Sequence, residues 1–183
     1  MASVKSMMKF FCIACIGIVL TGCMQNKKHL TPQQKYEQVC KKYTQMSEEK
    51  QLEALDEDWQ YIHYMKHPSL RVQLAAIEKN PKAVAEIERP ALEVQMIAVD
   101  KLIDGEGFSM TLARLIDKFD EKAQIAAVSK SPQIIRYIPY PSKSVQMAAV
   151  EKNPWVARSI NNLSKEAKAE AIRREPKLKS LLP

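Results

Sequence analysis

The chain has 183 residues, of which 46% are hydrophobic and 27% charged, and its 28 Lys and Arg against 21 Asp and Glu give a formal net charge of +7. This composition fits a folded domain, and the excess of positive charge is too small to indicate a nucleic-acid partner. No Ser–His–Asp order, glycine-rich phosphate loop or pair of carboxylates stands out, so we expect neither enzyme activity nor a cofactor.

The first thirty residues have the pattern of an export signal. Lys5 and Lys9 precede an apolar run, 10–20, which is shorter than the roughly 20 residues that span a bilayer. The run ends in Leu20-Thr21-Gly22-Cys23, which resembles the lipobox of bacterial lipoproteins. The resemblance implies a signal peptide over 1–22 and a lipidated tether over 23–30.

In such lipoproteins the Cys receives a diacylglycerol, so Cys23 is the expected lipidation site and acyl chains such as palmitate the expected membrane anchor. Met24, not Asp, follows it. By resemblance to enterobacterial lipoproteins, this predicts the periplasmic side of the outer membrane. Cys12 and Cys15 lie in the segment to be removed, which leaves Cys40 without an internal disulfide partner. We interpret Cys40 as a buried thiol, the alternative being an intermolecular disulfide.

A capping helix is predicted over 31–46. Thr31-Pro32-Gln33-Gln34 is a capping box with Pro in the first helical turn. An apolar stripe follows: Tyr36, Val39, Cys40, Tyr43 and Met46.

Six copies of a 22-residue repeat are predicted over 47–183, and seven extra residues interrupt the third copy near 103–109. We call the first residue of each copy its opener: Ser47, Ser69, Ala91, Asp120, Ser142 and Ser164. Five of the six are Ser or Asp, which cap helices. A fixed period of this length is typical of stacked units that cannot bury their apolar faces alone.

Apolar positions within each copy predict a first helix of about ten residues. Ala lies seven residues after every opener, an aliphatic residue lies one position later, and a mostly apolar position lies five residues after the opener. We expect all three on the inner face. Asn80-Pro81, Ser131-Pro132 and Asn153-Pro154 then predict the start of a second, shorter helix. The expected fold is therefore all-α, an α-solenoid with an N-terminal capping helix.

The phrase Ser142-Lys-Ser-Val-Gln-Met-Ala-Ala-Val-Glu-Lys-Asn-Pro154 resembles the short, HEAT-like α-helical repeats of leucine-rich-variant proteins. It also resembles 22-residue repeats of bacterial and viral proteins of unknown function. The resemblance covers 47–183 and implies a curved superhelix with a binding role. It implies no chemistry and no functional residues.

Two rows of polar residues recur. Ten residues after the opener come Lys79, Lys101, Lys130, Lys152 and Arg174. They would form a basic track for an acidic partner, or simply complement the helix dipole at each C-terminus. Four residues after the opener come Gln51, Gln73, Gln95, Gln124 and Gln146, which we interpret as a structural hydrogen-bond ladder.

The insertion contains Asp104-Gly105-Glu106-Gly107. A flexible loop at Gly105, Glu106 and Gly107 is a candidate contact site, and a tolerated insertion is the alternative. His63 and His67 are four residues apart, but His67 precedes Pro68, where the helix should end, so we expect no metal site.

The favoured function is a lipid-anchored interaction scaffold that binds an envelope protein or peptide, for example a phage- or plasmid-encoded exclusion or assembly factor. A structural envelope spacer without a specific partner is the first alternative. An enzyme or metal-binding protein is the second.

Overall fold

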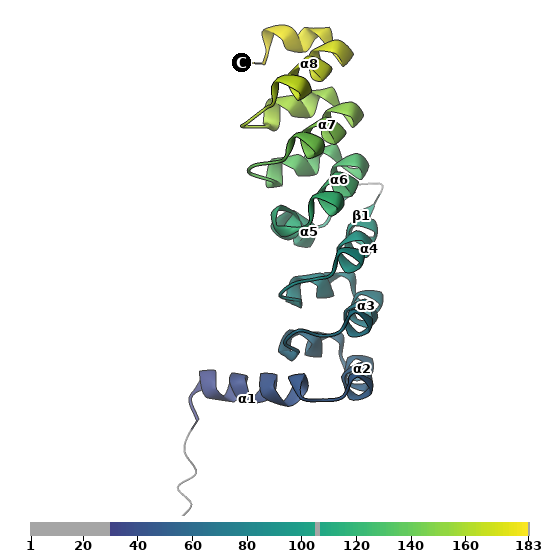
Figure 1. Cartoon of the computed structure of the whole chain (residues 1–183), viewed down its shortest axis with the longest axis vertical. Helices are drawn as coiled ribbons and strands as arrows, with labels where there is room; N and C mark the ends of the chain where they lie inside the picture. Colours follow the sequence, from purple (N-terminus) through teal and green to yellow (C-terminus); the bar gives the residue numbers. More distant parts are fainter. Residues whose placement is uncertain (1–29, 105–106, 183) are drawn as a thin grey trace, which may run out of the picture.

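The computed structural model describes residues 30–104 and 107–182, and in these residues the chain is mostly helical (Figure 1). The α-helices are α1 (Pro32–Thr44), α2 (Glu48–Glu57), α3 (Leu70–Lys79), α4 (Leu92–Leu102), α5 (Met110–Leu115), α6 (Glu121–Lys130), α7 (Lys143–Lys152) and α8 (Lys165–Arg174). The 3-10 helices are η1 (Trp59–Tyr64), η2 (Pro81–Glu86), η3 (Ile116–Lys118), η4 (Pro132–Tyr137), η5 (Pro154–Ser159) and η6 (Pro176–Ser180). The expected all-α class is confirmed at this level.

Successive copies lie side by side along the long axis of the molecule (Figure 1). The first helices, α2, α3, α4, α6, α7 and α8, each contact the next one in this order, and we call their side of the molecule the α side. The 3-10 helices lie on the opposite side, where η1 contacts η2 and η4 contacts η5. Helix α1 contacts η1 and lies across the end of the array. Its capping box is formed, because the Thr31 hydroxyl accepts from the Gln34 N–H while the Gln34 side chain accepts from the Thr31 N–H.

The openers cap the first helices where they are serines. Ser47, Ser69, Ser142 and Ser164 each accept a hydrogen bond from the backbone N–H three residues later. The expected cap at Asp120 is wrong. Its carboxylate instead accepts a hydrogen bond of 2.8 Å from the side-chain amide of Gln95, which belongs to the preceding copy.

The second element is a 3-10 helix rather than a short α-helix in five of the six copies, and in the third copy it is α5 followed by η3. Asn80 and Asn153 cap it as expected, accepting from the N–H two residues later, and Pro is its first residue. Ser131 makes no such cap bond and is buried, so that detail of the prediction is wrong. The expected inner faces are buried: Ala83, Val84 and Ile87; Ile134, Ile135 and Ile138; Val156, Ala157 and Ile160; and Leu178 and Leu182.

One core runs through all the copies. The fixed alanines are buried, as expected: Ala54, Ala76, Ala98, Ala127, Ala149 and Ala171. The aliphatic residue after each is buried in five copies, whereas Ile172 in the last copy is only partly buried.

The position five residues after the opener is not on the inner face. Met96 there is 40% exposed, and its equivalents are half-buried or exposed. The residue three after the opener is buried instead, as at Val72, Val94 and Val145. Each residue is rotated by 100° around the helix axis, so the residues three, four, seven and eight positions after the opener share one face. The residue five positions after the opener points away from that face.

The insertion forms a short β-hairpin where the sequence indicated only a loop. Strands β1 (Ile103–Asp104) and β2 (Gly107–Phe108) are antiparallel, with Ile103 opposite Phe108. The Phe108 ring packs edge-on against Tyr137 at 5.5 Å, which fixes the hairpin base to η4. Helix α5 then begins at its expected cap, Ser109.

Candidate interaction surface

The recurring glutamines form a ladder of hydrogen bonds inside the array. In copies two, three and five the Nε2 group donates to the carbonyl of the Pro that precedes the opener, at 2.8–2.9 Å: Gln73 to Pro68, Gln95 to Pro90 and Gln146 to Pro141. The Oε1 atom of the same glutamine accepts from the N–H of the next copy's opener: Ala91, Asp120 and Ser164, respectively. Gln51 and Gln124 donate only to carbonyls of the segment before their own helix. The structural interpretation of this row, which we call the amide ladder, is confirmed.

Two junctions between copies use a carboxylate instead. The hydroxyl of Ser69 donates to Glu48 and that of Ser142 donates to Glu121. These are the junctions at which Gln51 and Gln124 make no bond to the next opener within the described residues. The hydrogen bond from Ser69 holds the pKa of Glu48 below its usual value, with a further contribution from Arg71, and the bond from Ser142 does the same for the pKa of Glu121.

These two carboxylates predict a localised sensitivity to acid. A carboxyl group whose pKa is lowered in the folded state stabilises the fold above its unfolded pKa and loses this effect as the pH falls through the folded pKa. We expect the thermal midpoint to fall between pH 6 and pH 3, and to fall less in a Glu48→Gln/Glu121→Gln variant, as followed by circular dichroism. A Glu78→Gln control should fall as far as the wild type. If the thermal midpoint fell equally in the wild type, the double variant and the control, Glu48 and Glu121 would not be the source of the acid sensitivity.

The cations ten residues after the opener are partly neutralised. Lys79 forms an ion pair of 2.6 Å with Asp56, Lys130 pairs with Asp100, and Arg174 donates to the carbonyl of Glu151 at 2.9 Å. Each partner lies nine residues after the opener of the preceding copy. Lys130 also holds the pKa of Asp100 below its usual value.

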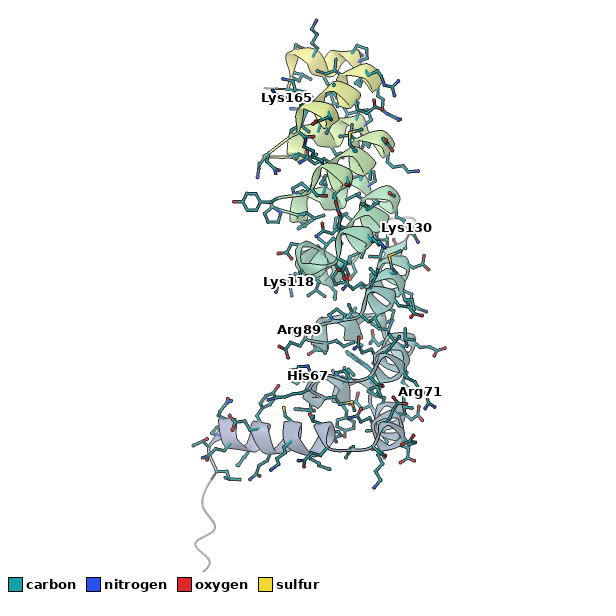
Figure 2. All side chains as sticks on the ribbon, in the orientation of Figure 1. His67, Arg71, Arg89, Lys118, Lys130 and Lys165 are labelled. Atoms are coloured by element: carbon teal, nitrogen blue, oxygen red, sulfur yellow. The ribbon has the colours of Figure 1, made fainter. Side chains whose placement is uncertain are left out.

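Lys101 and Lys152 form no ion pair with another described residue. The residue of the preceding copy that corresponds to Asp56 and Asp100 is Ser129 in the case of Lys152, which offers no charge. In Figure 2, Lys130 and Arg71 project on the α side, whereas Arg89 and Lys118 project on the 3-10 side. The basic track therefore presents less net positive charge than the sequence indicates.

Five partly exposed apolar residues run along the α side. They lie five residues after their openers and come from five consecutive first helices; we call them the apolar row: Leu52, Leu74, Met96, Ile125 and Met147. Because each of these helices contacts the next, the row continues from α2 to α7. The sequence pattern placed these residues inside, so their partial exposure was not predicted. The signal that separates them from the core is the buried residue three positions after each opener.

The remaining candidate residues from the sequence, Cys23 and the insertion residues 105–107, lie outside the apolar row or outside the described residues. Cys23, Gly105 and Glu106 lie outside the described residues. Gly107 is the first residue of β2, and its N–H donates to the Asp104 carboxylate at 3.0 Å. The hairpin lies at the junction of α4 and α5, so it is not part of the apolar row.

The structure also places the two histidines and Cys40. His63 is in η1, whereas His67 lies beyond the end of η1 with φ 55°, so the two do not share a helix face. No group of three or more His, Cys, Asp or Glu suited to a metal occurs in the part of the chain that the structure describes. Cys40 is only 3% exposed, which agrees with a packed thiol, since a disulfide to a second chain would need an accessible sulfur.

No protein-family model, curated protein or solved structure matches this chain. Of the helices that the structure describes, none has both the length and the apolar character needed to cross a membrane.

Proposed function

We propose that this chain is a lipid-anchored envelope protein whose repeats stack as an α-solenoid and bind another envelope protein or peptide along the apolar row. The anchor in this proposal is Cys23, and the location is the periplasmic side of a bacterial outer membrane. The lipobox resemblance supports both.

The observation that supports docking at the apolar row is its continuity. Large apolar side chains recur at the same position of five consecutive copies, where Met96 is exposed and the other four are partly buried against the core. The cations ten residues after the openers lie about 140° around the helix from the apolar row, and two of them, Lys79 and Lys130, are paired with carboxylates. A contiguous apolar surface of this kind is typical of a protein–protein contact.

The expected partner is a segment with one apolar face, such as an amphipathic helix. The basic track and the hairpin would lie outside the contact or at its rim. A spacer without a partner remains the second candidate function, and it is favoured only by the regularity of the array.

Replacing Met96 with Glu tests the docking surface. Met96 is 40% exposed, so a carboxylate there should leave thermal unfolding nearly unchanged while placing a charge in the contact. We expect crosslinking in cells, followed by mass spectrometry, to enrich one partner with the wild-type chain. With Met96→Glu the amount of this partner should fall at least about tenfold, which corresponds to a loss of roughly 1.4 kcal/mol in binding free energy. The matched control is Met110→Glu, because Met110 is 57% exposed but lies on α5, outside the apolar row.

The same experiment separates the alternatives. A partner retained by Met96→Glu would contradict docking at the apolar row. No partner enriched by any chain would favour the spacer. A Cys23→Ser arm tests the anchor, since the chain should leave the membrane fraction if Cys23 is lipidated, and continued membrane association with normal processing would contradict this part of the proposal.

A further inference from the structure

Two neighbouring hollows lie on the 3-10 side near α1, away from the apolar row. The first has a volume of about 260 Å³ and is lined by Trp59, Gln60, His63, Tyr64 and Glu86. The second, of about 280 Å³, shares His63 and Glu86 and adds, among others, Tyr36 and Lys66. Because His63 and Glu86 line both hollows, the two lie next to each other, and we call the pair of hollows the aromatic groove.

The polar groups at the centre of the aromatic groove are held in place. His63 bonds through Nδ1 to Glu86 Oε2 at 2.8 Å and through Nε2 to the Tyr36 hydroxyl at 3.2 Å. Both ring nitrogens are therefore used in positioning. The second carboxylate oxygen of Glu86, Oε1, has no hydrogen-bond partner among the described residues, so it can accept a bond from a ligand.

The aromatic side chains divide into packed and available rings. Tyr64 contacts the rings of Tyr36, Tyr43 and His63, so it belongs to a rigid cluster. Trp59 also lines the first hollow, and it is packed on one side against the core. The part of its indole that remains exposed can pack against a ligand, while the Tyr cluster supplies a fixed wall.

We propose that the aromatic groove binds a glycan chain. Sugar rings present flat C–H faces that pack on aromatic rings, and hydroxyls that bond to planar polar side chains such as those of Glu86 and Gln60. Two adjoining hollows suit consecutive sugar units. A proline-rich peptide would also pack on aromatic rings, but its prolines lack N–H groups, so it offers the Glu86 carboxylate fewer donors than the hydroxyls of a sugar chain do. This proposal is independent of docking at the apolar row.

Trp59 fluorescence tests the proposal. The chain has two tryptophans, so Trp155→Phe leaves Trp59 as the reporter. The full chain, in a detergent without a sugar head group, is titrated with a tetrasaccharide of N-acetylglucosamine and with maltotetraose. We expect a saturable change in emission with at least one of them. A Trp59→Phe chain that retains Trp155, which lies far along the array in η5, should show none.

Glu86→Gln in the Trp155→Phe background tests the residue assignment. Replacing a charged acceptor should weaken binding about tenfold or more, whereas Glu78→Gln on α3 should have no effect. Circular dichroism establishes that each variant is folded. The proposal is overturned if the Trp155→Phe chain gives no saturable response to either tetrasaccharide, if Glu86→Gln binds as tightly as its parent, or if only a proline-rich decapeptide binds.

Discussion

Replacing Gln146 with Leu should lower the free energy of unfolding by roughly 3 kcal/mol, the largest loss expected in the amide ladder. Gln146 is 2% exposed and makes three hydrogen bonds, to the carbonyls of Pro141 and Asn162 and from the N–H of Ser164. Leucine keeps most of the side-chain volume but leaves these three backbone groups without a partner. Such buried unpaired groups cost about 1–3 kcal/mol each, part of which the apolar side chain offsets.

Urea unfolding followed by circular dichroism measures this effect. Gln133→Leu is the matched control, because Gln133 is an exposed residue of η4, and its change should stay within about 0.5 kcal/mol. Gln124→Leu should fall between the two, since Gln124 is only partly buried and makes no bond to the next opener. Equal stability of the Gln146→Leu and Gln133→Leu chains would show that the amide ladder contributes nothing.

Enlarging one of the fixed alanines should also destabilise the fold. Ala149 is fully buried where α7 packs between α6 and α8, so a Leu at this position would push the helices apart. We expect Ala149→Leu to cost about 1–3 kcal/mol, and to lower the thermal midpoint accordingly.

The neighbouring residue provides the control for this substitution. Ala148 has the same side chain and lies in the same helix, but it is only partly buried. Ala148→Leu should therefore change stability by less than about 0.5 kcal/mol. If the two variants unfolded at the same urea concentration, close helix packing would not be the reason for the fixed Ala.

The repeat period predicted the position of every first helix because the deciding information is local. Ser capping residues, the Ala seven positions later and the Asn-Pro pairs each act within one or two helical turns, so one copy suffices to identify them. The amide ladder was also predictable, since a buried Gln between stacked units must satisfy its amide.

Features that depend on the neighbouring copy were not predictable from a single copy. Asp120 fails to cap α6 because Gln95, 25 residues earlier, engages its carboxylate. The pairing of Lys79 with Asp56 likewise depends on how two helices are placed beside each other. The pairing of β1 with β2 was also missed, because the seven-residue insertion was interpreted as a loop.

The aromatic groove could not be predicted from the sequence either, because its residues come from different elements. Tyr36, His63 and Glu86 come from α1, η1 and η2, and only the packing of these three elements brings them together. In the sequence His63 stands out only by its spacing from His67, from which we expect no metal site. The partner of His63 is a carboxylate 23 residues away.

The amide ladder has a consequence for how the chain folds. The Oε1 atom of Gln146 accepts from the N–H of Ser164, 18 residues further on, so copy five completes its bonds only when copy six has formed. Contacts between neighbouring copies favour rapid folding that starts in one copy and spreads to the next. The last copy carries Lys168 at the ladder position. An ammonium group has no acceptor atom, so Lys168 cannot accept from a backbone N–H as the ladder glutamines do.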